Sequence, residues 1–241
     1  MSITATLVPI LQDNYAWLLR DSASGFTAIV DPADPAPIIA AIEAAGGRLD
    51  LILLTHHHAD HVAGTDAVRA RFGAKVVGAA ADAHRLPRLD QAVAEGDRVA
   101  LGTAEAVVIE TPGHTRGQIN FHIPDGALLL SGDTLFSLGC GRLIEGTAAE
   151  MFASLAKLKA LPAETLVCCG HEYTESNARF ALSVDPDNAA LRARAEQVRA
   201  LRAAGKPTVP SRLADELAAN PFLRAPDAAG FAALRAAKDK F

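Results

Sequence analysis

Four apolar stretches of this chain end, within a few residues, at a histidine or an aspartate. The first, "LDLILL", runs directly into "THHHADH", and the other three lead to His114, Asp133 and His171, each preceded by a glycine. Short apolar runs bounded in this way predict strands buried on both faces. The ends of such strands are where an α/β scaffold exposes functional side chains. We therefore expect a sheet whose strand ends carry the chemistry.

The segments around these runs alternate between strand and helix. "YAWLL" and "FTAIV" are expected strands, and "HVAGTDAVRARFG" predicts a helix that ends at Gly73 before the strand "AKVVGAA". Further strands are expected in "DRVALG", "AEAVVIETPG", "INFHIP" and "ALLLSGD", the last two joined by a "PDG" turn. The middle of the chain is therefore mostly sheet, with at least one parallel crossover.

Helices dominate the rest of the chain. "TAAE" is a capping box before "MFASLAKLKALP", whose apolar residues recur at helical spacing. One more strand, "TLVCCG", precedes His171, and beyond it Leu191, Ala195 and Val198 form one stripe of a long helix. We expect a metal-binding catalytic domain over residues 1–171 and an α-helical domain over residues 172–241.

Composition and charge limit the class of protein. Half of the residues are hydrophobic and 21% are charged, and no apolar run approaches the roughly 20 residues of a membrane helix. The N-terminus lacks a basic segment followed by a long apolar one, and the three cysteines form no disulfide framework. These features predict a soluble cytoplasmic protein, which we expect to be a monomer.

The charge is unevenly distributed along the chain. Residues 1–171 carry 12 Lys and Arg against 19 Asp and Glu, a net charge of −7, whereas residues 172–241 carry 11 against 9, a net charge of +2. A protein that binds a polyanion is normally basic overall, so nucleic acid is disfavoured as a partner. Binding of a small anionic ligand at the basic C-terminal segment is compatible with this charge distribution.

The spacing within "HHHADH" favours metal ligation. In an extended segment His56 and His58 point to the same side and His57 points away, while Asp60 and His61 turn in another direction as a helix begins. Imidazoles and carboxylates packed beside a buried strand would be costly without a cation. The cysteines lie outside the cluster, which disfavours a structural zinc site. Together with the three later strand ends there are seven ligands, enough for two ions that share Asp133.

Two other histidines, His84 and His122, stand alone and are expected to be structural or surface residues. His57 is also expected to be structural, because the alternation turns it away from its neighbours.

At this point a family resemblance is plain. The pattern T-H-x-H-x-D-H, the histidine of "TPGHT", the aspartate of "GD" and the histidine of "GHEYT" resemble those of the metallo-β-lactamase-fold hydrolases. Within that superfamily "GCGRLIEGT", "CGHEYT", "NPFLR" and "LRAAKDKF" are similar to the hydroxyacylglutathione hydrolases, or glyoxalase II enzymes, across nearly the whole chain. The resemblance implies an α/β fold, an αββα sandwich, with a C-terminal α-helical domain.

The resemblance also implies the site residues. One metal ion would be bound by His56, His58 and His114, the other by Asp60, His61 and His171, with Asp133 bridging the two. The ions implied are two divalent cations, zinc above all, with iron or manganese as partial replacements. Contacts to the glutathione moiety are implied for four residues: Arg142, Tyr173, Arg235 and Lys238.

The implied reaction is hydrolysis of S-(2-hydroxyacyl)glutathione thioesters, such as S-D-lactoylglutathione, to glutathione and a 2-hydroxy acid such as D-lactate, the second step of methylglyoxal detoxification. Two cations about 3.5 to 4 Å apart can lower the pKa of a shared water from about 15.7 to about 7, which provides hydroxide at neutral pH. Asp60 and Asp133 are the candidate catalytic residues, with Asp60 also aiding proton transfer. Asp31, in "IVDPAD", either orients a ligand histidine or forms an Asp-Pro turn.

Several alternatives stay open on the sequence. The substrate could be a lactone, a β-lactam or a different thioester, and a single-iron sulfur dioxygenase or a non-catalytic metal-binding protein would also carry a ligand set of this kind. Arg235 and Lys238 would also suit a solvated helix face. Two departures from the family pattern concern substrate preference: Ile144 stands where many members have an aromatic residue, and Gln118 where histidine is frequent.

Overall fold

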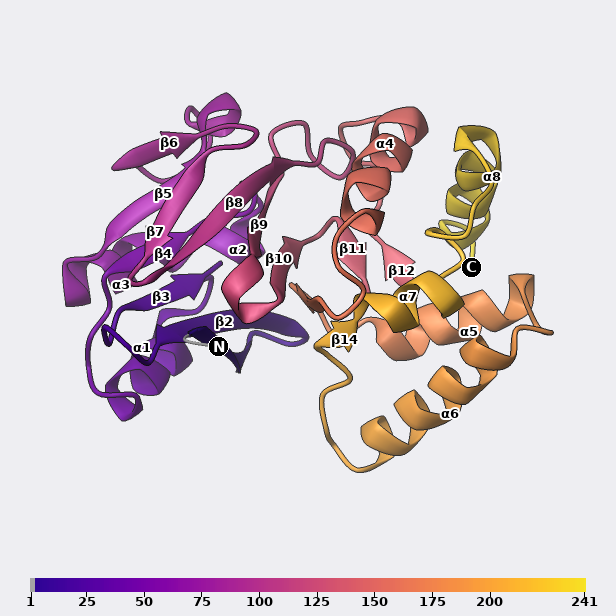
Figure 1. Ribbon diagram of the computed structural model, residues 1–241, viewed down its shortest axis with the longest axis horizontal. Coiled ribbons are helices and arrows are strands. Elements are labelled where there is room, and N and C mark those ends of the chain that lie inside the picture. Colours follow the sequence, from indigo (N-terminus) through magenta and orange to yellow (C-terminus); the bar gives the residue numbers. More distant parts are fainter. Residues whose placement is uncertain (1–2) are drawn as a thin grey trace.

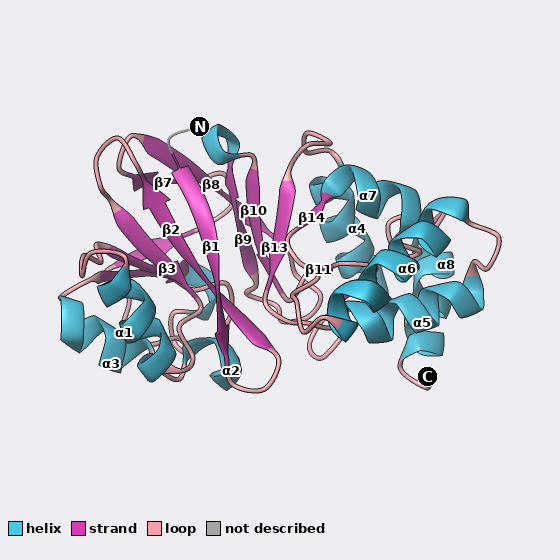
Figure 2. Cartoon of the chain, turned by 90° about the horizontal axis from the view of Figure 1, so that it is seen from below, coloured by secondary structure: helices cyan, strands magenta, loops and turns pink. Residues whose placement is uncertain are grey.

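Two six-stranded β-sheets packed face to face form the centre of the computed structural model, which describes residues 3–241 (Figures 1 and 2). The first sheet has the strand order β1-β2-β3-β4-β5-β6, with β1 Ile3–Ile10, β2 Asn14–Asp21, β3 Thr27–Val30, β4 Leu51–Leu53, β5 Lys75–Ala79 and β6 Gln91–Val93. The second has the order β14-β13-β10-β9-β8-β7, with β7 Arg98–Leu101, β8 Ala104–Glu110, β9 Ile119–Ile123, β10 Leu128–Gly132, β13 Leu166–Cys169 and β14 Ser211–Arg212. A small separate hairpin joins β11 Leu135–Phe136 to β12 Gly139–Cys140.

Helices cover the outer faces of both sheets. The first sheet packs against α1 Pro35–Ala44 and α3 Thr65–Phe72, and the short α2 Ala59–Val62 precedes α3. On the other side of the molecule lie α4 Ala148–Lys159, α5 Thr174–Val184, α6 Ala189–Ala203, α7 Leu213–Ala219 and α8 Ala228–Lys238 (Figure 2). The predicted αββα sandwich with C-terminal helices is therefore confirmed.

The apolar runs form strands buried on both faces, as their composition predicts. Successive side chains of a strand point to opposite faces, so Leu53 enters the core between the sheets while Ile52 packs toward α1 and α3. In the second sheet Leu130 faces the same inter-sheet core, and Leu129 packs with α4 and α8. This double burial holds the strand ends in fixed positions.

The strands that deliver the histidines and aspartates end at one edge of the sandwich. β4 is parallel to β3 and β5, and β10 is parallel to β13. Because parallel strands share a direction, the loops after β10 and β13 leave the second sheet on the same side. The sheets thereby bring together segments that are more than 100 residues apart in sequence.

The structure differs from the predicted elements in several places. The helix expected over "HVAGTDAVRARFG" is two helices, α2 and α3, separated at Gly64. A β-carbon at Gly64 would lie 2.4 Å from the carbonyl oxygen of Pro32, so the chain needs glycine to pass there. α3 ends at Gly73 with φ of +72°, as predicted. α1 and β6 were not predicted.

The C-terminal segment also contributes to the second sheet. β14 pairs antiparallel with β13, in the registers Leu166–Arg212 and Val167–Ser211. This strand was not predicted, because only two residues pair and no alternation marks them. Among residues 3–241 we find no helix whose length and apolar character would let it traverse a lipid bilayer.

We expect Leu130→Ala to lower the free energy of unfolding by about 3 to 5 kcal/mol, because Leu130 is fully buried between the sheets and its truncation leaves a cavity. Leu11→Ala is the matched control, since Leu11 is 55% exposed and its loss should change stability by less than about 0.5 kcal/mol. Urea denaturation of both variants measures the difference. Equal losses would contradict the placement of Leu130 in the core.

Candidate metal centre

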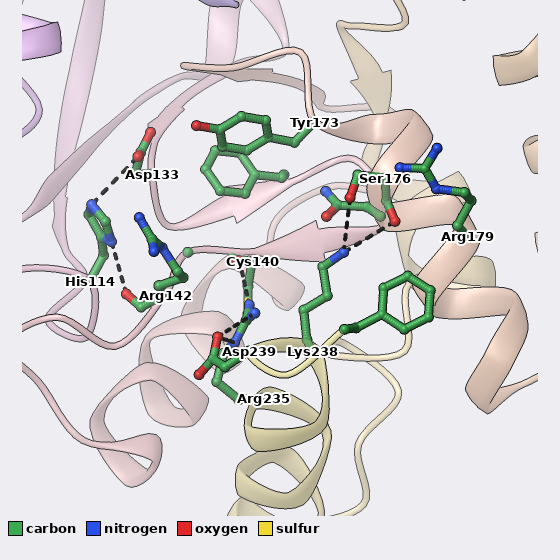
Figure 3. A pocket seen from close by; sticks show the side chains of 14 residues that line it. His114, Asp133, Cys140, Arg142, Tyr173, Ser176, Arg179, Arg235, Lys238 and Asp239 are labelled. Atoms are coloured by element: carbon green, nitrogen blue, oxygen red, sulfur yellow. Dashed lines mark hydrogen bonds and ion pairs between the residues drawn. The ribbon is translucent and has the colours of Figure 1, made fainter.

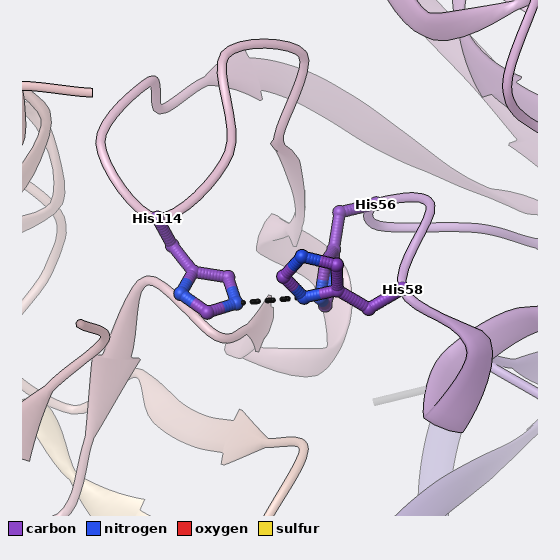
Figure 4. Close-up of side chains that lie close together, drawn as sticks. All are labelled: His56, His58 and His114. Atoms are coloured by element: carbon purple, nitrogen blue, oxygen red, sulfur yellow. Dashed lines mark hydrogen bonds between the residues drawn. The ribbon is translucent and has the colours of Figure 1, made fainter. Parts of the chain in front are cut away.

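Three histidines from two loops form the first half of the cluster. His56 and His58 follow β4, and His114 lies in the loop between β8 and β9 (Figure 4). His58 Nδ1 lies 3.1 Å from His56 Nε2 and 3.0 Å from His114 Nε2. Three ring nitrogens thus converge on one small volume, as three ligands of one ion would.

The second half consists of Asp60, His61 and His171. Asp60 and His61 are on the short helix α2, and His171 follows β13. His61 Nε2 lies 3.3 Å from His171 Nε2, and Asp60 Oδ2 lies 3.4 Å from His171 Nε2 and 3.7 Å from His61 Nε2. These three atoms again face one point.

Asp133 lies between the two halves. Its Oδ2 is 3.5 Å from His114 Nε2 and 3.4 Å from His171 Nε2, and its Oδ1 is 3.4 Å from His61 Nε2. The side chain is buried, yet Oδ1 has no hydrogen-bond partner among the described residues. A buried carboxylate oxygen without a partner requires a compensating group, and a cation between the two halves would provide it.

Acceptors behind the rings orient four of the five histidines. The pairs are His56 Nδ1 with Thr55 Oγ1 at 3.0 Å, His61 Nδ1 with Asp31 Oδ2 at 2.9 Å, His114 Nδ1 with the Arg142 carbonyl at 2.9 Å, and His171 Nδ1 with Asp13 Oδ1 at 3.1 Å. Each acceptor favours the tautomer that carries its proton on Nδ1, so that the Nε2 lone pair faces the cluster. His58 is the exception, since its Nδ1 faces inward.

Asp31 is therefore more than a turn residue. Its two carboxylate oxygens accept hydrogen bonds from the Thr55 backbone N–H at 2.8 Å and from the Thr55 hydroxyl at 2.6 Å, and Oδ2 also faces His61. No role was predicted for Asp13 or Asn14 from the sequence. The Asn14 amide donates to the Asp60 carboxylate at 3.1 Å. No local pattern reveals such residues, because their partners are distant in sequence.

The electrostatics of the two halves differ. Burial and neighbouring imidazoles lower the pKa of His56, His58 and His114, so these rings are neutral and offer lone pairs. Burial also opposes protonation of His171, but hydrogen bonds with Asp133 and Asp60 outweigh it and raise the pKa of His171 to about 10. The carboxylates therefore produce a local potential that favours positive charge, which a divalent cation can satisfy in place of a proton.

The donor set fits divalent metal ions. Three groups among the described residues hold ligand atoms within 4.8 Å of one another: His56, His58 and His114; Asp60, His61 and His171; and Asp31, His56 and His61. In the last group Asp31 faces Nδ1 of His61, behind the ring. Nitrogen and carboxylate donors without thiolates suit zinc, iron and manganese. His57, His84 and His122 belong to none of these groups.

A cavity of about 390 Å³ opens beside the cluster (Figure 3). His114 and Asp133 line one end of it, and residues of α5 and α8 line the other. The four residues predicted to contact glutathione all line this cavity: Arg142, Tyr173, Arg235 and Lys238. Arg179, on α5, is a further cationic residue of the lining that was missed in the sequence.

The residues that line the cavity differ in exposure and in the contacts that their side chains make with the rest of the protein. Tyr173 is 37% exposed and stacks on His171, with ring centroids 4.5 Å apart. The Lys238 ammonium donates to the Ser176 carbonyl at 3.1 Å, and burial lowers its pKa. Arg235 is only 4% exposed, and its guanidinium donates to the Cys140 carbonyl at 2.9 Å and pairs with Asp239 at 2.8 Å. The solvated-face alternative for Arg235 is therefore wrong.

The two departures from the family pattern lie outside this cavity. Gln118 is fully buried. In the carboxamide orientation that gives hydrogen bonds to both its oxygen and its nitrogen, the oxygen accepts from the Asp133 backbone N–H at 2.8 Å. It supports the backbone of Asp133 and does not face a substrate. Ile144 is 53% exposed and is absent from the cavity lining. All three cysteines are free and buried.

Comparison with known proteins decides the family. Residues 11–171 match the model of the metallo-β-lactamase superfamily, and residues 172–241 match that of the hydroxyacylglutathione hydrolase C-terminus. A hydroxyacylglutathione hydrolase of Acidiphilium cryptum is 63% identical, covering 99% of this chain and 97% of its own length. The chain belongs to the hydroxyacylglutathione hydrolase family of the metallo-β-lactamase superfamily. A second member, from Cereibacter sphaeroides, is 56% identical over 98% of the chain and 91% of its own length.

Solved structures agree with the fold of a hydroxyacylglutathione hydrolase family member. ETHE1 from Myxococcus xanthus superposes with a TM-score of 0.72 at 25% identity, covering 98% of this chain and 90% of that protein. The protein TTHA1623, solved in a di-iron-bound form, superposes with a TM-score of 0.60 at 30% identity, covering 70% of this chain and 91% of its own length. The chain is thus a hydrolase by family, with the family's fold.

We expect Asp133→Ala to lose at least one equivalent of bound metal, because this carboxylate lies between both sets of ligand atoms. Elemental analysis after dialysis measures the content, and hydrolysis should fall with it. Glu43→Ala is the control, since Glu43 pairs with Arg71 on the surface. Metal content equal to that of the unmodified chain would refute a bridging role.

Proposed function

We propose that this chain hydrolyses S-(2-hydroxyacyl)glutathione thioesters, such as S-D-lactoylglutathione, to glutathione and a 2-hydroxy acid such as D-lactate, the second step of methylglyoxal detoxification. The observation that carries the proposal is a cluster of two ligand triads with Asp133 between them, seven metal-type ligands in all, that opens into a cavity lined by cationic residues. Full-length relatives named hydroxyacylglutathione hydrolase support it. A cavity with acids at one end and cations at the other suits an anionic thioester.

We propose two metal ions, both zinc or zinc mixed with iron or manganese. One would be held by His56, His58 and His114, the other by Asp60, His61 and His171, with Asp133 shared by both. The separation of the donor atoms into two groups with Asp133 between them supports two sites. The di-iron form of TTHA1623 shows that a protein of this fold binds a pair of ions. When bound, the ions would supply Lewis acidity and lower the pKa of a water.

The residues of the chain then have separate tasks. Asp60, whose side chain is 45% exposed, accepts a hydrogen bond from Asn14 and can accept another from the attacking water. The water oxygen bonds to the thioester carbonyl carbon and loses a proton with the help of Asp60, the carbon–sulfur bond breaks with its electron pair on sulfur, and the proton passes to the thiolate, which gives glutathione and the 2-hydroxy acid. A thiol with a pKa of about 8.5 is a good leaving group, so the glutathione thiolate can depart without prior protonation.

The cationic end of the cavity would bind the tripeptide. Lys238 on α8 offers charge to its carboxylates, Arg142 offers a second cation nearer to His114, and Tyr173 offers a hydroxyl beside the cluster (Figure 3). Arg235 is held by Asp239 and the Cys140 carbonyl, so we assign to it mainly the docking of α8 onto β12. These contacts would fix the thioester carbonyl at the metal end.

The remaining expectations are part of the same proposal. We propose that residues 1–171 bind the metals and residues 172–241 supply most of the substrate contacts, although β14 extends the second sheet. We also propose a cytoplasmic monomer without a nucleic-acid partner. The three free, buried cysteines and the net charge of −5 support that assignment.

We expect the purified chain loaded with zinc to hydrolyse S-D-lactoylglutathione at least about a hundred-fold faster, in kcat/KM, than a lactone or a β-lactam, because only the first substrate carries the anionic tripeptide. Spectrophotometric assays of the three substrates under one condition measure the ratio. A comparable or higher rate with either competitor would overturn the assignment of substrate class.

Lys238→Ala should raise KM for S-D-lactoylglutathione about ten-fold and change kcat by less than about two-fold, because the ammonium would bind ground state and transition state equally. Lys240→Ala is the matched control, since Lys240 lies on the same segment but is exposed and outside the cavity lining. Steady-state kinetics of both variants test the role. An unchanged KM in Lys238→Ala would exclude the contact.

A further inference from the structure

A closed ring of polar side chains, a histidine, an arginine and two carboxylates, lies behind the first half of the metal centre. It consists of His57, Asp82, Arg85 and Glu145, and we call it the polar ring. His57 Nδ1 is 3.1 Å from Asp82 Oδ2, and His57 Nε2 is 3.6 Å from Glu145 Oε1. Arg85 pairs with the same two carboxylates, 2.5 Å from Asp82 and through a second ion pair with Glu145. The Arg85 guanidinium and the His57 ring thus each contact both carboxylates.

The ring connects separate loops of the chain. His57 lies between the two ligands His56 and His58, in the loop after β4. Asp82 ends a 3₁₀ turn after β5, and Glu145 lies in the loop after β12. Because no two of these segments are neighbours in sequence, the ion pairs fix their relative positions.

Glu145 also holds the loop that carries His114. Its carboxylate accepts from the Arg116 backbone N–H at 2.8 Å, and its own backbone N–H donates to the His114 carbonyl at 3.2 Å. The next residue, Gly146, donates to the Gly113 carbonyl at 3.0 Å. The His114 loop is therefore bonded on both sides of the histidine.

Two glycines show how closely these loops pack. A β-carbon on Gly117 would lie 2.2 Å from the Asp82 carboxyl carbon, and one on Gly146 would lie 2.6 Å from the Cα of Gly113. Asp82 itself is 2% exposed, so its carboxylate is packed against the backbone of the His114 loop. Displacement of either carboxylate would therefore move the ligand loop.

The ring contacts the ligand loops of the first half, and α2, which carries Asp60 and His61 of the second half, begins directly after His58. The second half is held by other groups, since Asp13 faces His171 Nδ1, Asp31 faces His61 Nδ1 and Asn14 donates to Asp60. None of these acceptors and donors belongs to the polar ring. Arg85 and the Arg116 backbone N–H hold the pKa of Glu145 at about 2, so its charge persists at neutral pH.

We propose that the polar ring positions His56, His58 and His114, and that it affects the metal affinity of this half more strongly than that of the half that contains His171. The inference rests on the ligand assignment of the proposed function. The four residues of the polar ring are positioning residues, because they act through the ligand loops and do not line the cavity beside the cluster. Groups behind metal ligands commonly contribute about ten- to a hundred-fold in affinity.

The test is the variant Glu145→Gln, which keeps the size of the side chain but presents an amide to Arg85 and to the Arg116 N–H. The metal-free full-length chain is titrated with Zn²⁺ against a competing chelator, and two dissociation constants are extracted. Titration of His58→Ala and of Asp60→Ala identifies the constant of each half. We expect Glu145→Gln to raise the Zn²⁺ dissociation constant of the half that contains His58 about ten- to a hundred-fold. The dissociation constant of the half that contains His171 should change by less than about three-fold.

Glu43→Gln is the matched control, because Glu43 and Arg71 form an exposed ion pair at 2.6 Å that is remote from the ligand loops. Both constants should be unchanged in it. If Glu145→Gln leaves both constants unchanged, or weakens both equally, the inference is overturned and the ring is only a structural element. Should Glu145→Gln not fold, Arg85→Lys, which keeps the charge but loses the fork between the two carboxylates, is judged by the same criterion.

The titration contains no substrate, so it separates this inference from the proposed function. A chain that binds two ions with the expected dependence on Glu145 but hydrolyses no glutathione thioester would contradict the function alone. A chain that takes up no metal would overturn both.

Discussion

Backbone hydrogen bonds between the two sheets at one edge of the sandwich are the constraint on which the site depends. The Ile119 N–H, at the start of β9, donates to the Thr55 carbonyl after β4 at 2.9 Å, and the Tyr15 N–H of β2 donates to the Gly170 carbonyl after β13 at 2.8 Å. Each bond joins a strand of one sheet to a ligand loop of the other. The inter-sheet core supplies the burial energy, and these bonds fix the register in which the loops meet.

That register makes the electrostatic arrangement possible. Five imidazoles and two carboxylates lie in contact, most of them buried, and Asp133 Oδ1 has no hydrogen-bond partner among the described residues. Without a cation the second half compensates by protonation, because the carboxylates raise the pKa of His171 to about 10 although burial opposes it. A divalent ion would provide the same positive charge together with a preferred geometry. Metal binding is therefore expected to be coupled to proton release.

The sequence predicted the parts of this site that depend on local pattern. Buried strands predicted where His114 and Asp133 would emerge, because apolar runs and a following glycine are local signals. The orienting residue Asp13 could not be predicted, because its partner His171 is 158 residues away in sequence. The two residues meet only when the turn between β1 and β2, which carries Asp13, packs beside the end of β13. The break at Gly64 depends on a close approach of Pro32, which is also a tertiary contact. The burial of Arg235 likewise required the docking of α8.

Asp133 lines the cavity at the metal end, whereas Arg179, Arg235 and Lys238 line it at the end formed by α5 and α8, and this polarity would orient an anionic substrate. The acids and imidazoles of the cluster come from residues 31–171, whereas Lys238 and Arg179 come from the basic C-terminal segment. In the proposed function an anionic tripeptide would be attracted to the cationic end, and its thioester would then lie at the end where metal would supply positive charge. Tyr173 joins the two ends, because its ring stacks on His171 while it lines the cavity. A displacement of α5 would therefore also reach His171, one of the proposed metal ligands, and would couple substrate binding to the metal centre.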